Sequence, residues 1–348
     1  MQILRTVTHA CLLCLLLSLA SSPASAQADD MGKVTPVTVE NFTRAETDVY
    51  FRKFVDVNGL GRFRHGRQPA SVDSQDVIRM NLDTFYSSAV FDLDAGPVTI
   101  SLPNGGGRFM SLLAISEDHY ALPVTYAPGK YTFTRAQVGT RYMCVILRTF
   151  VDPDNSNDVA AARALQDQVQ VQQASAGKFE VPAWDPVSLG KARDALLQLT
   201  ALGGESGPRF GRKNEVDPIA HLLATAAGWG GNPRVAAVYE MEYPAANDGK
   251  TVYRLTVKDV PVDGFWSVSV YNAKGYFEKN ELGVYAFNNV TARRSTDGSV
   301  TLQFGGCGPG TPNCIPVSPG WNYVARMYRP RKAILDGTWK LPQLQPVG

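Results

Sequence analysis

The sequence lacks most of the short patterns that mark a known catalytic centre. It contains only four histidines, and none of them forms the His-x-His or His-x-x-x-His pair found in many zinc sites. No Gly-x-Ser-x-Gly segment is present, which excludes the nucleophile elbow of α/β-hydrolases. The glycines at 105–107 are not followed by Gly-Lys-Ser or Gly-Lys-Thr, which excludes a P-loop. We therefore expect no metal and no cofactor.

Long runs of like charge are also missing. Lys and Arg total 34 and Asp and Glu total 32, which gives a net charge of +2. A near-neutral chain without a basic block or an acidic tail offers no electrostatic footprint for nucleic acid. We therefore expect no nucleic-acid partner.

The first residues have the order of a secretory signal peptide. Arg5 precedes an apolar run at 10–20, and Ala24-Ser25-Ala26 ends the segment with the small-x-small pattern of a cleavage site. The run is too short for a membrane-spanning helix, which needs about 20 residues. We expect residues 1–26 to be removed, leaving a periplasmic or secreted protein without a membrane span. The alternative is an anchor that is never cut.

Cysteines are few, with five in the whole chain. Two lie in the predicted signal peptide, whereas Cys307 and Cys314 lie in one loop rich in glycine and proline. In an oxidising compartment such a pair is expected to form a disulfide. A two-thiolate metal site is the alternative, but no second pair completes it. Cys144 lies in an apolar run and is expected to be a buried, inert thiol.

The residues from 27 to 153 are expected to form an N-terminal β domain that begins with one helix. Apolar residues from Phe42 to Phe54 have helical spacing. The β-rich runs at 97–102 and 108–115 flank a glycine-rich turn and predict a hairpin.

The residues from 154 to 230 have helical spacing, and those from 231 to 348 return to short strands. Asp185-Pro186 and Asp217-Pro218 are helix-start signals, because Asp caps a helix and proline fits its first position. The later strands and turns suggest a sandwich or jelly roll. The predicted fold class is mainly β with a helical insert (α+β multidomain), with two β-sandwich or jelly-roll-like units separated by the helical segment.

Two groups of motifs carry a family resemblance. Residues 79–93 together with 117–120 resemble domain of unknown function 1254 of exported bacterial proteins. Residues 265–271, 304–307, 320–323, 328–331 and 335–339 resemble its usual C-terminal companion, domain of unknown function 1214. The resemblance implies an exported protein with an N-terminal β domain, a helical region and a C-terminal jelly-roll-like domain. It implies no established activity.

The polar residues of the first motif group are the candidate site. In an extended chain, alternate side chains share a face, so polar groups gather where these strands begin and end. Carboxylate, imidazole and phenol groups together could support acid–base chemistry or hold a polar ligand. The alternative is that they satisfy backbone groups in turns. The candidate catalytic residues are Asp83, Tyr86, Glu117 and His119, and the candidate ligand-binding residues are Arg79, Asn81, Asp83, Tyr86, Asp118 and His119.

Aromatic residues of the C-terminal unit are a second candidate surface. They could stack on sugar rings, or they could form the core of a sandwich. Trp266 and Phe304 are expected in the core. A basic end, with Arg326 the first of four cations up to Lys332, could meet a carboxylate-bearing ligand or a partner chain.

We interpret the chain as an exported ligand-binding or assembly module for a glycan or another polar or amphipathic small molecule. The sequence also allows self-association of the chain into a homo-oligomer. The alternative function is an ester or glycoside hydrolase, with His119 as the base and a serine such as Ser87 or Ser116 as the nucleophile.

Overall fold

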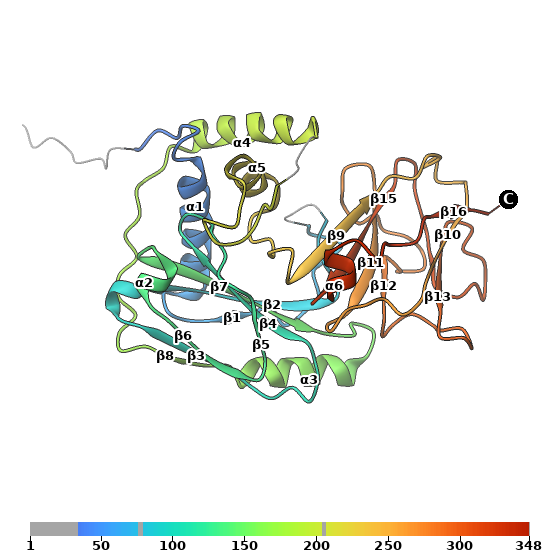
Figure 1. Ribbon diagram of the computed structural model, residues 1–348, viewed down its shortest axis with the longest axis horizontal. Coiled ribbons are helices and arrows are strands. Elements are labelled where there is room, and N and C mark those ends of the chain that lie inside the picture. Colours follow the sequence, from blue (N-terminus) through green and yellow to red (C-terminus); the bar gives the residue numbers. More distant parts are fainter. Residues whose placement is uncertain (1–33, 76–78, 204–206, 348) are drawn as a thin grey trace, which may run out of the picture. The chain divides into compact units, whose positions relative to one another are not determined.

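The computed structural model describes residues 34–75, 79–203 and 207–347 (Figure 1). Its N-terminal β region is built around one five-stranded sheet. The predicted signal peptide lies outside the described residues. In the order β1-β2-β7-β4-β5, the sheet contains Arg64–His65, Thr84–Asp92, Tyr142–Phe150, Met110–Ser116 and Thr125–Tyr126.

A second, three-stranded sheet covers one face of the first. In the order β6-β3-β8 it contains Gly129–Phe133, Val98–Leu102 and Gln170–Gln172. Apolar side chains of β3 and of β4 and β7 meet in one buried cluster between the sheets. The expected hairpin of 97–102 with 108–115 is wrong, because β3 pairs with β6 and β8 while β4 pairs with β7 and β5. The glycine-rich connection instead crosses from one sheet to the other, so both strands bury apolar residues from opposite sides.

Three helices gather over the opposite face of the five-stranded sheet (Figure 1). These are α1 (Phe42–Asn58), α4 (Pro186–Ala201) and α5 (Pro218–Gly228). The predicted helix starts are confirmed: Asp185 accepts hydrogen bonds from two backbone N–H groups of α4, and Asp217 accepts one from α5. Because each cap satisfies an otherwise unpaired N–H, both helices begin where the sequence indicates. The remaining helical elements are η1 (Leu93–Ala95), α2 (Arg135–Val138), α3 (Ser156–Asp167) and α6 (Lys332–Leu335).

The C-terminal region has two further four-stranded sheets. One, in the order β14-β13-β10-β16, contains Cys314–Ile315, Val300–Phe304, Tyr253–Val257 and Gln345–Pro346. The other, in the order β12-β11-β15-β9, contains Ala286–Asn288, Trp266–Tyr271, Asn322–Tyr328 and Ala237–Glu242. A buried cluster between them includes Trp266 and Phe304, as expected.

The predicted fold class is confirmed, because two β-rich regions are separated in sequence by a helical segment. The disulfide between Cys307 and Cys314 is confirmed too. Cys144 is buried and unpaired, and burial raises the pKa of its thiol. No helix in the described part of the chain has the length and apolar character needed to cross a membrane.

The segment that precedes β2 docks on the C-terminal sheet through Arg326. This fully buried side chain donates hydrogen bonds to Ser269 Oγ at 3.1 Å and to Tyr271 OH at 2.7 Å. It also donates to the carbonyl oxygen of Arg79 at 2.7 Å. Tyr271 OH in turn donates to the carbonyl oxygen of Met80 at 2.6 Å. The guanidinium therefore joins the two β regions of the chain.

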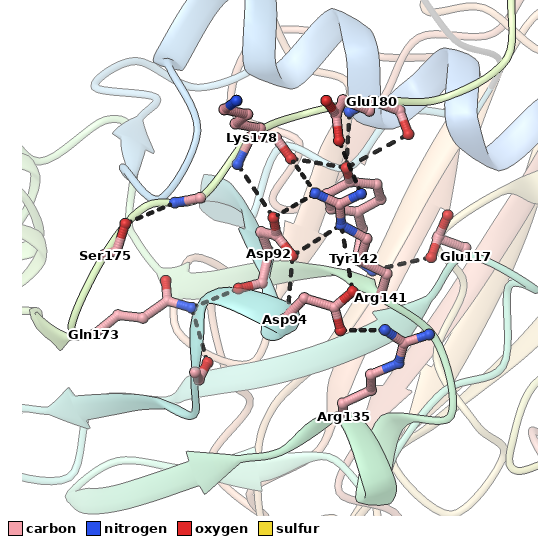
Figure 2. Close-up of polar contacts among 12 residues, drawn as sticks. Asp92, Asp94, Glu117, Arg135, Arg141, Tyr142, Gln173, Ser175, Lys178 and Glu180 are labelled. Atoms are coloured by element: carbon pink, nitrogen blue, oxygen red, sulfur yellow. Dashed lines mark hydrogen bonds and ion pairs between the residues drawn. The ribbon is translucent and has the colours of Figure 1, made fainter.

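A second polar network fixes the other end of β2. Figure 2 shows Asp92 between the guanidinium of Arg141 and the backbone N–H of Lys178. Burial of the carboxyl acts to raise the pKa of Asp92, but hydrogen bonds from Arg141 and from the backbone N–H groups of Lys178 and Asp94 outweigh it and lower the pKa. This network ties the ends of two neighbouring strands to the segment that leads to α4.

Replacement of Arg326 by Met is predicted to lower the free energy of unfolding by about 3–5 kcal/mol, because it leaves buried acceptors without donors. Chemical denaturation measures the loss. The exposed Lys274→Met removes the same charge from a surface turn and is expected to change stability by less than about 0.5 kcal/mol. Equal effects of the two changes would contradict the docking role of Arg326.

Candidate functional site

The four candidate catalytic residues lie in two separate groups. Tyr86 pairs with Arg148 across β2 and β7, whereas Ser116, which ends β4, pairs with Met143. These two β7 positions are five residues apart, which corresponds to about 17 Å along a strand. The backbone of Asp83 and Tyr86 therefore lies toward one end of the sheet, and that of Glu117 and His119 follows the other end. Gly230 bridges part of this distance, because it bonds both to His119 and to Arg148, the partner of Tyr86.

The candidates that precede β2 make contacts across to the C-terminal region. Asn81 donates to Tyr328 OH at 3.0 Å, and Asp83 accepts from Asn288 Nδ2 at 2.9 Å. Arg79 donates to Tyr243 OH at 2.8 Å. Burial raises the pKa of Asp83, while the hydrogen bond from Asn288 opposes that shift. These side chains hold the docked segment in place.

The acidic candidates that follow β4 bond to backbone and to α1. Glu117 accepts from the backbone N–H of Tyr142 at 2.9 Å (Figure 2). Its pKa is raised by burial, against the effect of that hydrogen bond. Asp118 pairs with Arg44 of α1 at 2.6 Å. Glu117 therefore attaches the end of β4 to the start of β7, and Asp118 attaches it to α1.

His119 is buried with both ring nitrogens engaged. Its Nε2 accepts from the backbone N–H of Gly230 at 2.9 Å, so Nδ1 carries the proton and donates to Thr225 Oγ1 at 2.8 Å. The ring stacks on Trp229 with centroids 5.4 Å apart. Burial lowers the pKa of His119 to about 3, and the nearby His221 adds to the effect.

Nitrogen NMR is predicted to show His119 neutral, with the proton on Nδ1, from pH 8 down to about pH 4. The unfolded chain titrates near pH 6.5, so the imidazole stabilises the fold above that pH and the contribution is lost as pH falls toward 3. Wild type should lose up to about 1.4 kcal/mol per pH unit more than His119→Gln over this window. A His119 resonance that titrates near pH 6.5 in the folded protein would contradict this assignment.

A different charged residue occupies the middle of the N-terminal sheet. Arg148 lies on β7, a strand whose nine residues are all buried, and is itself 6 % exposed. It donates to Asn232 Oδ1 at 3.2 Å and to the carbonyl oxygen of Gly230 at 2.9 Å. Its Cζ lies 5.4 Å from the centroid of the Tyr86 ring. No carboxylate of the described residues pairs with this guanidinium.

Three tyrosines, Tyr86, Tyr239 and Tyr328, lie around Arg148. Tyr86 is 38 % exposed and Tyr239 is 43 % exposed. Tyr239 OH accepts from Asn232 Nδ2 at 2.9 Å, and its ring lies 6.4 Å from that of Tyr328. Burial raises the pKa of Tyr328 well above its ordinary value. This hydroxyl therefore stays neutral at physiological pH and supplies no countercharge to Arg148.

The aromatic surface continues along β9, the edge strand of its sheet. Tyr239 and Met241 lie opposite Arg326 and Val324 of β15, so they share one face, and Tyr243 follows in the same alternation. Met241 is 46 % exposed and Tyr243 is 56 % exposed. We name this surface the tyrosine–arginine face; it comprises Tyr86, Arg148, Asn232, Tyr239, Met241, Tyr243 and Tyr328.

The sequence matches two families described as proteins of unknown function. The first, DUF1254, matches residues 60–173, and the second, DUF1214, matches residues 239–332. The chain belongs to the proteins that pair a DUF1254 domain with a DUF1214 domain. The resemblance inferred from the sequence motifs is thus confirmed. Arg148 belongs to the DUF1254 domain and Tyr239 to the DUF1214 domain, so both domains build the tyrosine–arginine face.

Two solved structures share this fold. The VPA0106 protein from Vibrio parahaemolyticus superposes with a TM-score of 0.64 at 18% identity, covering 88% of this chain and 98% of its own. A protein from Burkholderia cenocepacia superposes with a TM-score of 0.50 at 14% identity, covering 88% of this chain and 86% of its own. At these identities the likeness shows the fold alone. A search of curated proteins finds no match.

A hollow of about 240 Å³ in the DUF1214 domain is less suited to a ligand. It is lined in part by Glu278, Lys279 and Tyr285. Glu278 accepts a hydrogen bond from Ser318, and Lys279 pairs with Asp73. Its charged groups are thus hydrogen-bonded or ion-paired at the surface, whereas Arg148 is a buried cation without a carboxylate partner among the described residues.

Arg148 and Tyr239 were not among the predicted site residues. A signal for Arg148 exists in the sequence, because it is the one charged residue after Tyr142 in an otherwise apolar strand ending at Phe150. Nothing local distinguishes Tyr239 from other strand tyrosines. Most of the C-terminal aromatic set is buried, with exposures of 0 % for Trp321 and Tyr323.

Proposed function

We propose that this DUF1254–DUF1214 protein is an exported ligand-binding protein whose ligand lies on the tyrosine–arginine face. The observation that supports this most is a row of exposed aromatic and apolar side chains, on β2 and on the edge strand β9, beside a buried cation. Soluble proteins rarely leave such side chains clustered at a polar centre without a binding role. An amphipathic ligand fits this face, because its tyrosines present both apolar rings and hydroxyl groups.

Two features are compatible with export. The Cys307–Cys314 disulfide suits an oxidising compartment, and no described helix is suited to crossing a membrane. The hydrolase alternative has less support, since Asp83 and Glu117 bond to Asn288 and to the backbone N–H of Tyr142 rather than to His119. The Nε2 lone pair that a general base would need is also occupied by a backbone N–H.

Isothermal titration calorimetry with 4-phenylbutyrate and with the neutral glycan cellotetraose tests the proposal. We expect 4-phenylbutyrate to bind, and Tyr239→Ala to weaken its binding about tenfold, or ~1.4 kcal/mol, because a central aromatic contact is lost.

The matched control is Leu199→Ala, which removes a 52 % exposed apolar side chain from α4 and should leave the affinity unchanged. Absence of binding by both probes at millimolar concentration would overturn the proposal. An equal loss of affinity in Tyr239→Ala and Leu199→Ala would show that the ligand does not bind at the tyrosine–arginine face.

A further inference from the structure

We infer that Arg148 is the recognition group for a carboxylate, so that the ligand of the tyrosine–arginine face is an amphipathic monocarboxylic acid. The inference rests on the proposed function and names the chemical class of its ligand. It starts from the electrostatics of a cation that is buried among neutral groups.

Other arginines of the chain show how burial of a guanidinium is ordinarily compensated. Arg193 pairs with the buried Glu46, and Arg108 pairs with Asp158. The fully buried Arg326 donates to four oxygen acceptors and lies in the field of Asp83. Among the described residues, Arg148 bonds to an amide oxygen and a carbonyl oxygen, and its further neighbour Tyr86 carries a neutral hydroxyl. Burying a cation in this way is costly, and an anion would remove most of that cost.

The guanidinium has donors to spare for such an anion. An arginine carries five N–H donors, and the bonds to Asn232 and Gly230 use two of them. The planar fork of a guanidinium matches the two oxygens of a carboxylate in a bidentate pair. Asn232 holds the fork in position, since its amide also donates to Tyr239 OH.

Tyr86 lies over Arg148. The centroid of its ring is 5.4 Å from the guanidinium carbon, and the residue is exposed to solvent. A carboxylate that bound Arg148 from this side would displace the exposed Tyr86 ring.

Charge and surface together favour a monocarboxylic acid over a phosphate. One buried guanidinium neutralises a single negative charge, whereas a phosphate dianion would leave one charge buried and unpaired. The row of Tyr239, Met241 and Tyr243 along β9 supplies an apolar track for the body of the molecule. A carboxylate head with an aromatic or aliphatic body therefore fits both features.

The test compares three probes that share a phenylalkyl body: 4-phenylbutyrate, 4-phenylbutyramide and 3-phenylpropyl phosphate. Calorimetry on the wild-type protein should show the acid binding at least tenfold more tightly than the amide, and more tightly than the phosphate. Arg148→Gln should abolish the preference for the acid. Arg148→Lys, which keeps the charge but loses the fork, should keep part of it.

The matched control is Arg254→Gln on β10, where the guanidinium bonds to Gln303 of the neighbouring strand β13, in the C-terminal sheet that does not contain β9. This variant removes the same charge and should retain the full preference for the acid. Thermal unfolding of each variant checks that it folds. If Arg148→Gln does not fold, the selectivity of the wild type and of Arg148→Lys decides the question.

Each outcome has a distinct consequence. Equal affinities of the wild type for acid and amide would overturn the role of Arg148 and leave the face as a binding surface. Tighter binding of the phosphate would overturn the assignment to carboxylic acids. Failure of all three probes to bind would count against the proposed function itself and the inference with it.

Discussion

The docking of residues 79–83 onto the C-terminal sheet is the constraint on which the rest of the structure depends. Arg326 holds this segment by its backbone oxygens, and Asn288 holds it through Asp83. Because β2 begins directly after the segment, its position fixes where the N-terminal sheet meets the other region. The docked segment covers part of the β15 face but leaves the alternate side chains of β9 exposed. The tyrosine–arginine face is the part of this junction that the docked segment does not cover.

Two buried guanidiniums therefore serve this junction in different ways. Arg326 is surrounded by acceptors and lies near Asp83, so its charge is compensated inside the protein. Arg148 lies near the same junction with neutral partners and three surrounding tyrosines. The same fold surrounds the charge of Arg326 with acceptors and a nearby carboxylate, but gives Arg148 neutral partners alone. This difference is the basis for assigning Arg148 to an external anion.

Features set by neighbouring residues could be predicted from the sequence. The Asp-Pro helix starts follow from local capping, and the disulfide follows from two cysteines in one loop. The prediction of a hairpin between 97–102 and 108–115 was wrong because strand pairing is set by tertiary contacts. A glycine-rich connection permits a tight turn, and it equally permits a crossing between two sheets.

The candidate site shows the same division. Polar groups were expected near the ends of β2 and β4, and they are there, yet their partners are more than 100 residues away for Asn81 and His119. No local pattern indicates that His119 accepts from Gly230, or that Asn232 connects Arg148 to Tyr239. The lone charge of Arg148 in a buried strand was visible in the sequence, but its lack of a countercharge required the packed structure.

The most direct measurement is the Nε–Hε NMR signal of the Arg148 side chain during titration with 4-phenylbutyrate. A guanidinium that receives a carboxylate changes its hydrogen bonding, so the signal should shift in a saturable manner with the same midpoint as calorimetric binding, while that of Arg326 stays in place. A saturating calorimetric signal without any change at Arg148 would contradict the account.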